Sequence, residues 1–195
     1  MRSGRNLLAA TLAVTLIGVF TLPAAAQDCY LARGDMAAAA ERPSPMAQMV
    51  LSLGGEEMKL CYSRPSVKGR VIFGDLHPFG TQWRIGANEA TALHLPFAAE
   101  VGGVSLEPGS YSLYANLGEE EWEIVINGNA ERWGVPINDE VMAADVGHFR
   151  ATVETMDEAV EQLTFRWHGH GEAEGHLVME FERTRVEIPV KMTGM

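Results

Sequence analysis

The residues that can do chemistry are concentrated in one segment. Between residues 59 and 84 the chain has five basic residues and one acid, Asp75, a local charge of +4 in a protein of net charge −11. A basic segment on an acidic protein focuses the local field and favours binding of an anion. Alternatively, these cations neutralise the protein's own carboxylates in ion pairs. The basic residues are Lys59, Arg64, Lys68, Arg70 and Arg84.

A polar cluster stands at the end of this segment. Arg84, Asn88 and Glu89 follow Trp83, and such side chains bind a sugar or a carboxylate through planar hydrogen bonds and stacking. Alternatively, Arg84 pairs with Glu89 and Asn88 satisfies loop carbonyls, which makes the network structural. The predicted ligand-binding residues are Arg64, Lys68, Arg70, Trp83, Arg84, Asn88, Glu89 and Thr91.

Evidence for catalysis is weaker. Asp75 and Glu89, with Arg84 beside them, can be nominated as the carboxylate pair of a hydrolase. The sequence has no GxSxG, HExxH or Walker motif and no GxGxxG after a strand. A hydrolase that uses Asp75 and Glu89 is therefore the alternative function, and no cofactor is predicted.

Three histidines lie close together near the end of the chain: His168, His170 and His176. In an extended segment His168 and His170 point to one face. With Glu172 or Glu174 they have the donor types of a zinc or copper site. A glycine-rich, exposed hairpin tip explains the same composition. Both interpretations stay open, and no metal ligand is predicted.

Residues 1–26 have the pattern of a secretory signal peptide. Arg2 and Arg5 precede 16 uncharged residues, 7–22, and three alanines form a cleavage site. This stretch is shorter than the roughly 20 residues of a membrane-spanning helix, so no integral membrane anchor is predicted after cleavage. The mature chain, with 13 basic and 26 acidic residues, has a net charge of −13, which disfavours nucleic acid. We predict a periplasmic or secreted protein.

Both cysteines, Cys29 and Cys61, remain after cleavage. An even number of cysteines in an oxidising compartment favours a disulfide. This bridge closes a loop of about 33 residues, worth roughly 3–4 kcal/mol in the chain-entropy model. The alternative is two separate thiols.

Short apolar runs between turn residues predict one β-rich domain over residues 46–195, after a tail or linker at 27–45. Runs at 49–53 and 58–62 flank Gly54-Gly55 as a hairpin, and runs at 111–114 and 122–126 flank an acidic turn. Further strands are predicted at 92–97, 101–106, 148–153, 163–167, 177–181 and 185–190, and a short helical turn at 155–162. Core positions are predicted for Trp122 and Trp133, with a stacking platform as the alternative. About ten short strands with little helix indicate an all-β antiparallel sandwich or barrel, with a long ordered loop over residues 64–91.

Two motifs carry a family resemblance: Tyr-Ser-Arg-Pro at 62–65 and Trp-Arg-Ile-Gly-Ala-Asn-Glu-Ala-Thr at 83–91. From about residue 45 to 191 the chain resembles the bacterial family called domain of unknown function 2911. The resemblance implies an exported, predominantly β protein, and it assigns no activity and no catalytic residue. We therefore expect a non-catalytic binding or envelope-associated module for a small anionic or carbohydrate ligand; a purely structural or interaction role is the third possibility.

Overall fold

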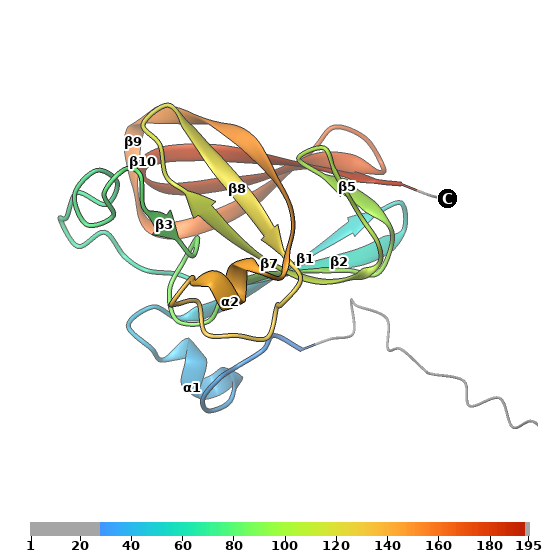
Figure 1. Ribbon diagram of the computed structural model, residues 1–195, viewed down its shortest axis with the longest axis horizontal. Coiled ribbons are helices and arrows are strands. Elements are labelled where there is room, and N and C mark those ends of the chain that lie inside the picture. Colours follow the sequence, from blue (N-terminus) through green and yellow to red (C-terminus); the bar gives the residue numbers. More distant parts are fainter. Residues whose placement is uncertain (1–27, 194–195) are drawn as a thin grey trace, which may run out of the picture.

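The computed structural model describes residues 28–193, so the predicted signal peptide, 1–26, lies outside the described residues. The all-β antiparallel prediction is confirmed: strands dominate, and the helices are short (Figure 1). No described helix combines the length and the apolar character needed to cross a membrane. The elements are α1 (Met36–Ala40), β1 (Met46–Leu53), β2 (Glu56–Ser63), β3 (Gln82–Trp83), β4 (Thr91–Leu95), β5 (Ala99–Val101), β6 (Val104–Leu106), β7 (Gly109–Asn116), β8 (Glu121–Asn127), α2 (Asp139–Met142), β9 (Asp145–Gly169) and β10 (Glu174–Met192).

The strands pair in the order β1-β2-β4-β7-β8-β9-β10-β5-β6, and β3 pairs with β7. The order has two ends, β1 and β6, so the sheet is not closed into a barrel. The predicted hairpin around Gly54-Gly55 is present, with β1 and β2 in register from Met46–Ser63 to Leu53–Glu56. Each glycine there has a positive φ, which the turn requires and which glycine adopts without steric cost.

The last two strands are much longer than predicted. β9 pairs with β8 along its first part and with β10 along its second part, so the β9 strand of the β9–β10 ribbon belongs to both layers of the sandwich (Figure 1). The ladder shifts register on both sides of Glu182, which has a positive φ of 58°. The helical turn predicted at 155–162 is wrong, because those residues continue β9. Most of their side chains are exposed, so the segment shows no apolar alternation.

The core lies between the layers, and the long segment between β2 and β4 contributes to it. Phe73 from that segment contacts Trp83 and Trp122 with ring centroids 5.0 and 4.8 Å apart, respectively. Trp83 also stacks on Phe181 of β10. Edge-on and offset ring contacts of this kind are favourable beyond the area they bury. These aromatic residues therefore fix a loop that lacks regular structure along most of its length.

The segment before β1 packs against the sheet. The predicted disulfide is present, and it joins Cys29 to Cys61 of β2 with an S–S distance of 2.01 Å. Asp35 caps α1 by accepting a hydrogen bond from the Ala38 amide. Ala39 is fully buried in a small second cluster that includes Met46 and both cysteines. Residues 28–45, predicted as a tail or linker, are thus attached to the domain at several points.

Candidate functional site

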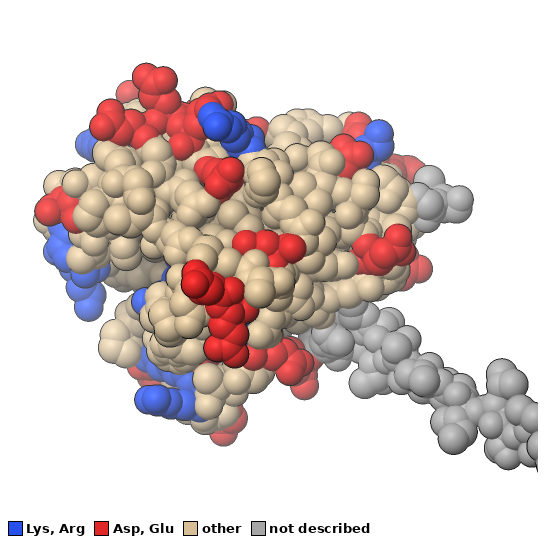
Figure 2. Space-filling view, in the orientation of Figure 1, with Lys and Arg blue, Asp and Glu red and all other residues tan. Residues whose placement is uncertain are grey.

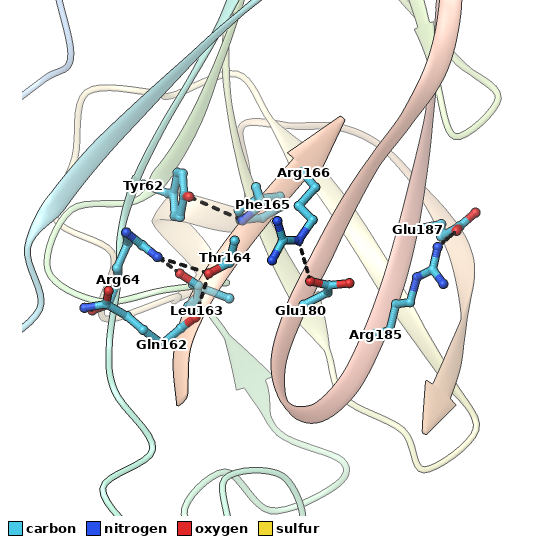
Figure 3. A network of polar contacts seen from close by, with 10 residues as sticks. All are labelled: Tyr62, Arg64, Gln162, Leu163, Thr164, Phe165, Arg166, Glu180, Arg185 and Glu187. Carbon is cyan, nitrogen blue, oxygen red and sulfur yellow. Dashed lines mark hydrogen bonds and ion pairs between the residues drawn. The ribbon is translucent and has the colours of Figure 1, made fainter. Parts of the chain in front are cut away.

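Arg64 holds the start of the long loop onto β9 (Figure 3). Its Nε donates to the Leu163 carbonyl at 3.0 Å, and its Nη2 donates to Thr164 Oγ1 at 3.1 Å. In return, Gln162 Nε2 donates to the Arg64 carbonyl. Arg64 Nε and Nη2 thus bind groups of the protein itself, so Arg64 mainly positions the loop.

The next two predicted cations differ from one another. Arg70 closes its own turn, because Nε donates to the Val67 carbonyl and Nη2 to the Ser66 carbonyl. The side chain of Lys68 is exposed, whereas its backbone amide binds the Glu161 carboxylate at 2.9 Å. Lys68 has a positive φ of 51°, so its side chain is presented from a tight turn. Lys68 is therefore available at the surface, although its turn is fixed to β9.

Glu89 forms a buried ion pair, but its partner is Arg42 and not Arg84. Arg42 Nη1 lies 3.0 and 2.8 Å from the two carboxylate oxygens of Glu89, whose side chain is only 2 % exposed. The Ala32 amide also donates to Glu89 Oε1 at 3.1 Å. The carboxylate is thus saturated by the segment before β1. A substrate has no access to a carboxylate covered in this way.

Asn88 and Thr91 stabilise the turn between β3 and β4. Asn88 adopts a left-handed φ of 57°, and its Nδ2 donates to the Ser44 carbonyl at 2.9 Å. Thr91 Oγ1 donates to the Ile85 carbonyl at 2.6 Å and is completely buried. A Cβ on Gly86 would lie 3.1 Å from the Ser63 carbonyl oxygen, so the motif's glycine allows this close approach. This part of the motif therefore builds the turn.

The tryptophans are divided between core and surface. Trp83 is 2 % exposed and Trp122 is 1 % exposed, so neither ring is available to stack on a ligand. The expectation of core packing is confirmed for Trp122 and wrong for Trp133, which is 38 % exposed. The guanidinium of Arg33 lies over the Trp133 ring, 5.9 Å from its centroid. Trp133 is therefore an exposed aromatic surface, which agrees with the alternative prediction for this residue.

Arg84 is the half-buried cation of the motif that has no ion pair in the described part of the chain. Its one hydrogen bond there runs from Nε to the Gly86 carbonyl at 3.3 Å, and burial lowers its pKa. A Cβ on Gly134 would lie 2.4 Å from Arg84 Cδ, so a glycine makes room for this side chain. The two Nη groups remain without a described acceptor.

His77 lies in the electric field of the same cations. Burial lowers the pKa of His77, and the positive charges of Arg84 and then Arg70 lower it further. Figure 2 shows scattered groups of acidic side chains on the viewed face, and one of several groups of basic side chains lies at its left margin, where Figure 1 draws the loop between β2 and β3. Arg84 and Arg70 thus make an electropositive site around a His77 ring that they hold neutral, and exposed Asp75 lies two residues before His77.

A groove lies elsewhere, between the β5–β6 turn and β10. It consists of two adjoining hollows of about 430 and 540 Å³ that share Glu100, Gly102, Gly103, His176 and Pro189. His176 Nδ1 lies 2.5 Å from Glu187 Oε2, and the His170 ring packs against the His176 ring. His168 stands opposite His176 in the β9–β10 ladder. In the described residues, no three potential ligands are placed to hold a metal ion.

A family model described as "Protein of unknown function (DUF2911)" matches residues 44–190. The chain belongs to this family. The DUF2911 match runs from just before β1 to near the end of β10, and it leaves out α1, Cys29 and Arg42. Searches of curated proteins and of solved structures gave no match.

The DUF2911 motifs therefore contribute mainly to folding, with Arg84 as the exception. The sequence pattern identified Arg84 but missed His77 and Arg42, and it gave the exposure of Trp133 only as the alternative. Arg42 lay in the presumed tail, and His77 had no neighbouring histidine or cysteine. The basic composition of residues 59–84 was the one signal that pointed to the electropositive site.

Proposed function

We propose that this protein is an exported, non-catalytic domain that binds a small anion, such as an organic acid or an acidic sugar, at Arg84. Arg70 contributes positive potential to the site, and His77 lies in the field of both arginines. The observation that carries the proposal is the half-buried guanidinium of Arg84, which has no carboxylate partner in the described chain. Arg132, by contrast, is more deeply buried but donates to two backbone carbonyls and to Ser112 Oγ.

The physical argument rests on desolvation. Partly removing a cation from water costs free energy unless a counter-charge or hydrogen-bond acceptor compensates. Arg42 is compensated by Glu89, and Arg64 by groups on β9. A carboxylate or phosphate offers two oxygens that match the fork of a guanidinium, so an anion supplies what Arg84 lacks.

Export is supported by two observations. Residues 1–26 have the composition of a signal peptide, and the Cys29–Cys61 disulfide is of the kind that persists in oxidising compartments. We therefore place the protein in the periplasm or outside the cell. An envelope-associated role fits the same location.

The alternatives have different support. A hydrolase that uses Glu89 is disfavoured because Arg42 and the Ala32 amide occupy this buried carboxylate. A structural role agrees with the internal bonds of Asn88 and Thr91. It leaves the unpaired charge of Arg84 unexplained.

The test is thermal unfolding of the purified protein with phosphate, sulfate, citrate, glucuronate and, for comparison, glucose. An anion at about 100 times its dissociation constant stabilises the protein by about 2.7 kcal/mol. Arg84→Gln should abolish this stabilisation while the protein still folds. Arg150→Gln is the matched control, because this arginine is exposed and pairs with Glu121. The proposal fails if no anion stabilises the wild type, or if Arg84→Gln responds as the wild type does.

A further inference from the structure

Two imidazole rings, those of His170 and His176, line the hollow of about 430 Å³ beside the turn between β9 and β10. Their ring centroids lie 4.5 Å apart, and the ring planes make an angle of 74°. Two imidazoles that bind one metal ion through nitrogen atoms at about 2.0–2.1 Å have ring centroids about 4.5–5 Å apart. The two rings are therefore spaced as two ligands of one ion are.

The ring of His176 is oriented by a carboxylate. Its Nδ1 lies 2.5 Å from Glu187 Oε2, and the other oxygen of Glu187 accepts a hydrogen bond from Arg185 (Figure 3). An ionised carboxylate only accepts hydrogen bonds, so Nδ1 carries the proton, and Nε2 of the neutral imidazole has a free lone pair. Histidines that bind metals almost always donate their other ring N–H in this way. His176 thus has the tautomer and the support that a metal ligand needs.

His170 belongs to a turn that is fixed at both sides. Its amide donates to the Glu174 carbonyl at 3.0 Å, which closes the turn. The Ala173 carbonyl accepts a hydrogen bond from the Met192 amide at 2.8 Å, which ties the turn to the end of β10. A ligand that binds to side chains on such a fixed support orders little further chain, and this lowers the cost of binding.

The surroundings of the two rings favour a cation and leave it room. Glu100 and Glu174 line the same hollow, whereas Lys191 is its one lining residue with a permanent positive charge. The side chain of His176 is 31 % exposed, and His170 is exposed. An ion can therefore reach both rings from solvent and keep water molecules in its remaining coordination positions.

We propose that His170 and His176 bind one Cu²⁺ ion at adjacent coordination positions, with water as the remaining ligands. Imidazole nitrogen suits Cu²⁺, and among the divalent ions of the first transition row Cu²⁺ forms the most stable complexes with such ligands. His168 stands opposite His176 in the ladder, but the described residues place no three ligands around one point, so His168 is not a ligand. The site shares no residue with the proposed anion site at Arg84 and does not depend on it.

Titration calorimetry of the purified protein with CuCl₂ measures the number of sites and their affinity. The electron paramagnetic resonance spectrum of the one-to-one complex should show coupling to two imidazole nitrogens. His170→Gln and His176→Gln should each weaken binding at least tenfold, and thermal unfolding checks that both variants fold. His168→Gln is the matched control, since it removes a histidine of the same hairpin, and it should bind Cu²⁺ as the wild type does.

Glu187 is a positioning residue, so its replacement tests the geometry separately from the ligands. Glu187→Gln should weaken Cu²⁺ binding by about tenfold or more, as the loss of such a carboxylate usually does. Glu180→Gln is its control, because it removes an ion pair with Arg166 on the same two strands. A wild type that binds no Cu²⁺, or a complex with one or with three nitrogen ligands, overturns the proposal. So does an equal loss of affinity in His168→Gln, or none in Glu187→Gln.

Discussion

Arg42 and Glu89 form a buried ion pair across 47 positions of sequence, with Nη1 of the arginine within 3.0 Å of both carboxylate oxygens. The pair joins the segment before β1 to the turn that also holds Arg84. Arg42 lies outside the region matched by the family model, whereas Glu89 lies inside it. The segment before β1 therefore supplies the cation that neutralises a buried carboxylate of the domain.

Replacing Arg42 by alanine should destabilise the protein strongly. The change leaves the Glu89 carboxylate buried without its cation, and breaking a buried pair in this way costs about 3–5 kcal/mol. Urea unfolding measures the loss. Arg150→Ala is the control, because its pair with Glu121 is largely exposed and should contribute less than about 1 kcal/mol. Equal losses in the two variants would contradict the buried pair.

Removing the disulfide should have a comparable but separate effect. The bridge joins residues 32 positions apart, and a loop of this size corresponds to about 3–4 kcal/mol. Cys29→Ser with Cys61→Ser should lower the free energy of unfolding by this amount. We also expect Arg42→Ala to cost less in this background than in the wild type, because both contacts hold the same segment. Strictly additive losses would show that the two contacts act independently.

Two adjacent glycines allow steric contact to be separated from backbone preference. Gly102 and Gly103 both have positive φ, but only a Cβ on Gly102 would meet the Phe149 ring, at 2.2 Å. Gly102→Ala should therefore cost about 1–3 kcal/mol more than Gly103→Ala, the typical range for overpacking. Thermal unfolding of both variants measures the difference. Equal costs would mean that the β5–β6 turn moves away from Phe149 freely.

Acid should destabilise the protein partly through His94. This residue is 3 % exposed, and burial, followed by the charge of Lys59, lowers its pKa below 6.5. Between pH 6.5 and the lower folded pKa, the unfolded state binds a proton that the folded state does not. The stability due to His94 is therefore fully present above pH 6.5. It is lost as the pH is lowered from 6.5 toward the folded-state pKa, with a slope of at most about 1.4 kcal/mol per pH unit.

The measurement is urea unfolding from pH 7 down to the ordinary carboxyl pKa of 4.5. His94→Gln should flatten the slope. His77 titrates in the same direction, so part of the slope should remain. An unchanged slope in His94→Gln would contradict the role of its burial.

Local patterns predicted the elements that depend on neighbouring residues. Gly54-Gly55 between apolar runs identified the β1–β2 hairpin, and the cysteine count in a secreted context identified the Cys29–Cys61 bridge. The segment 155–162 was missed because the ribbon there is solvated on much of its surface and has no apolar periodicity. Amphipathic alternation indicates a strand only where one face is buried.

The composition of the sequence predicted where the site lies, but it did not predict which charged residues pair with each other. Arg84 and Glu89 are close in sequence, which favours an ion pair between them, yet Glu89 forms its ion pair with Arg42 on a distant segment. The left-handed backbone at Asn88 redirects the chain between them. Neither the turn conformation nor the position of α1 can be derived from spacing alone. The same holds for Trp133, whose exposure depends on which segments cover it.

The β9–β10 ribbon, whose β9 strand belongs to both layers, has a consequence for the folding of the chain. Neither layer is complete until the ribbon has formed, and Val101 of β5 must then find Val190 of β10. Such pairings between residues distant in sequence are entropically costly to form and slow the folding of all-β proteins. The chain should therefore fold slowly and in one cooperative step.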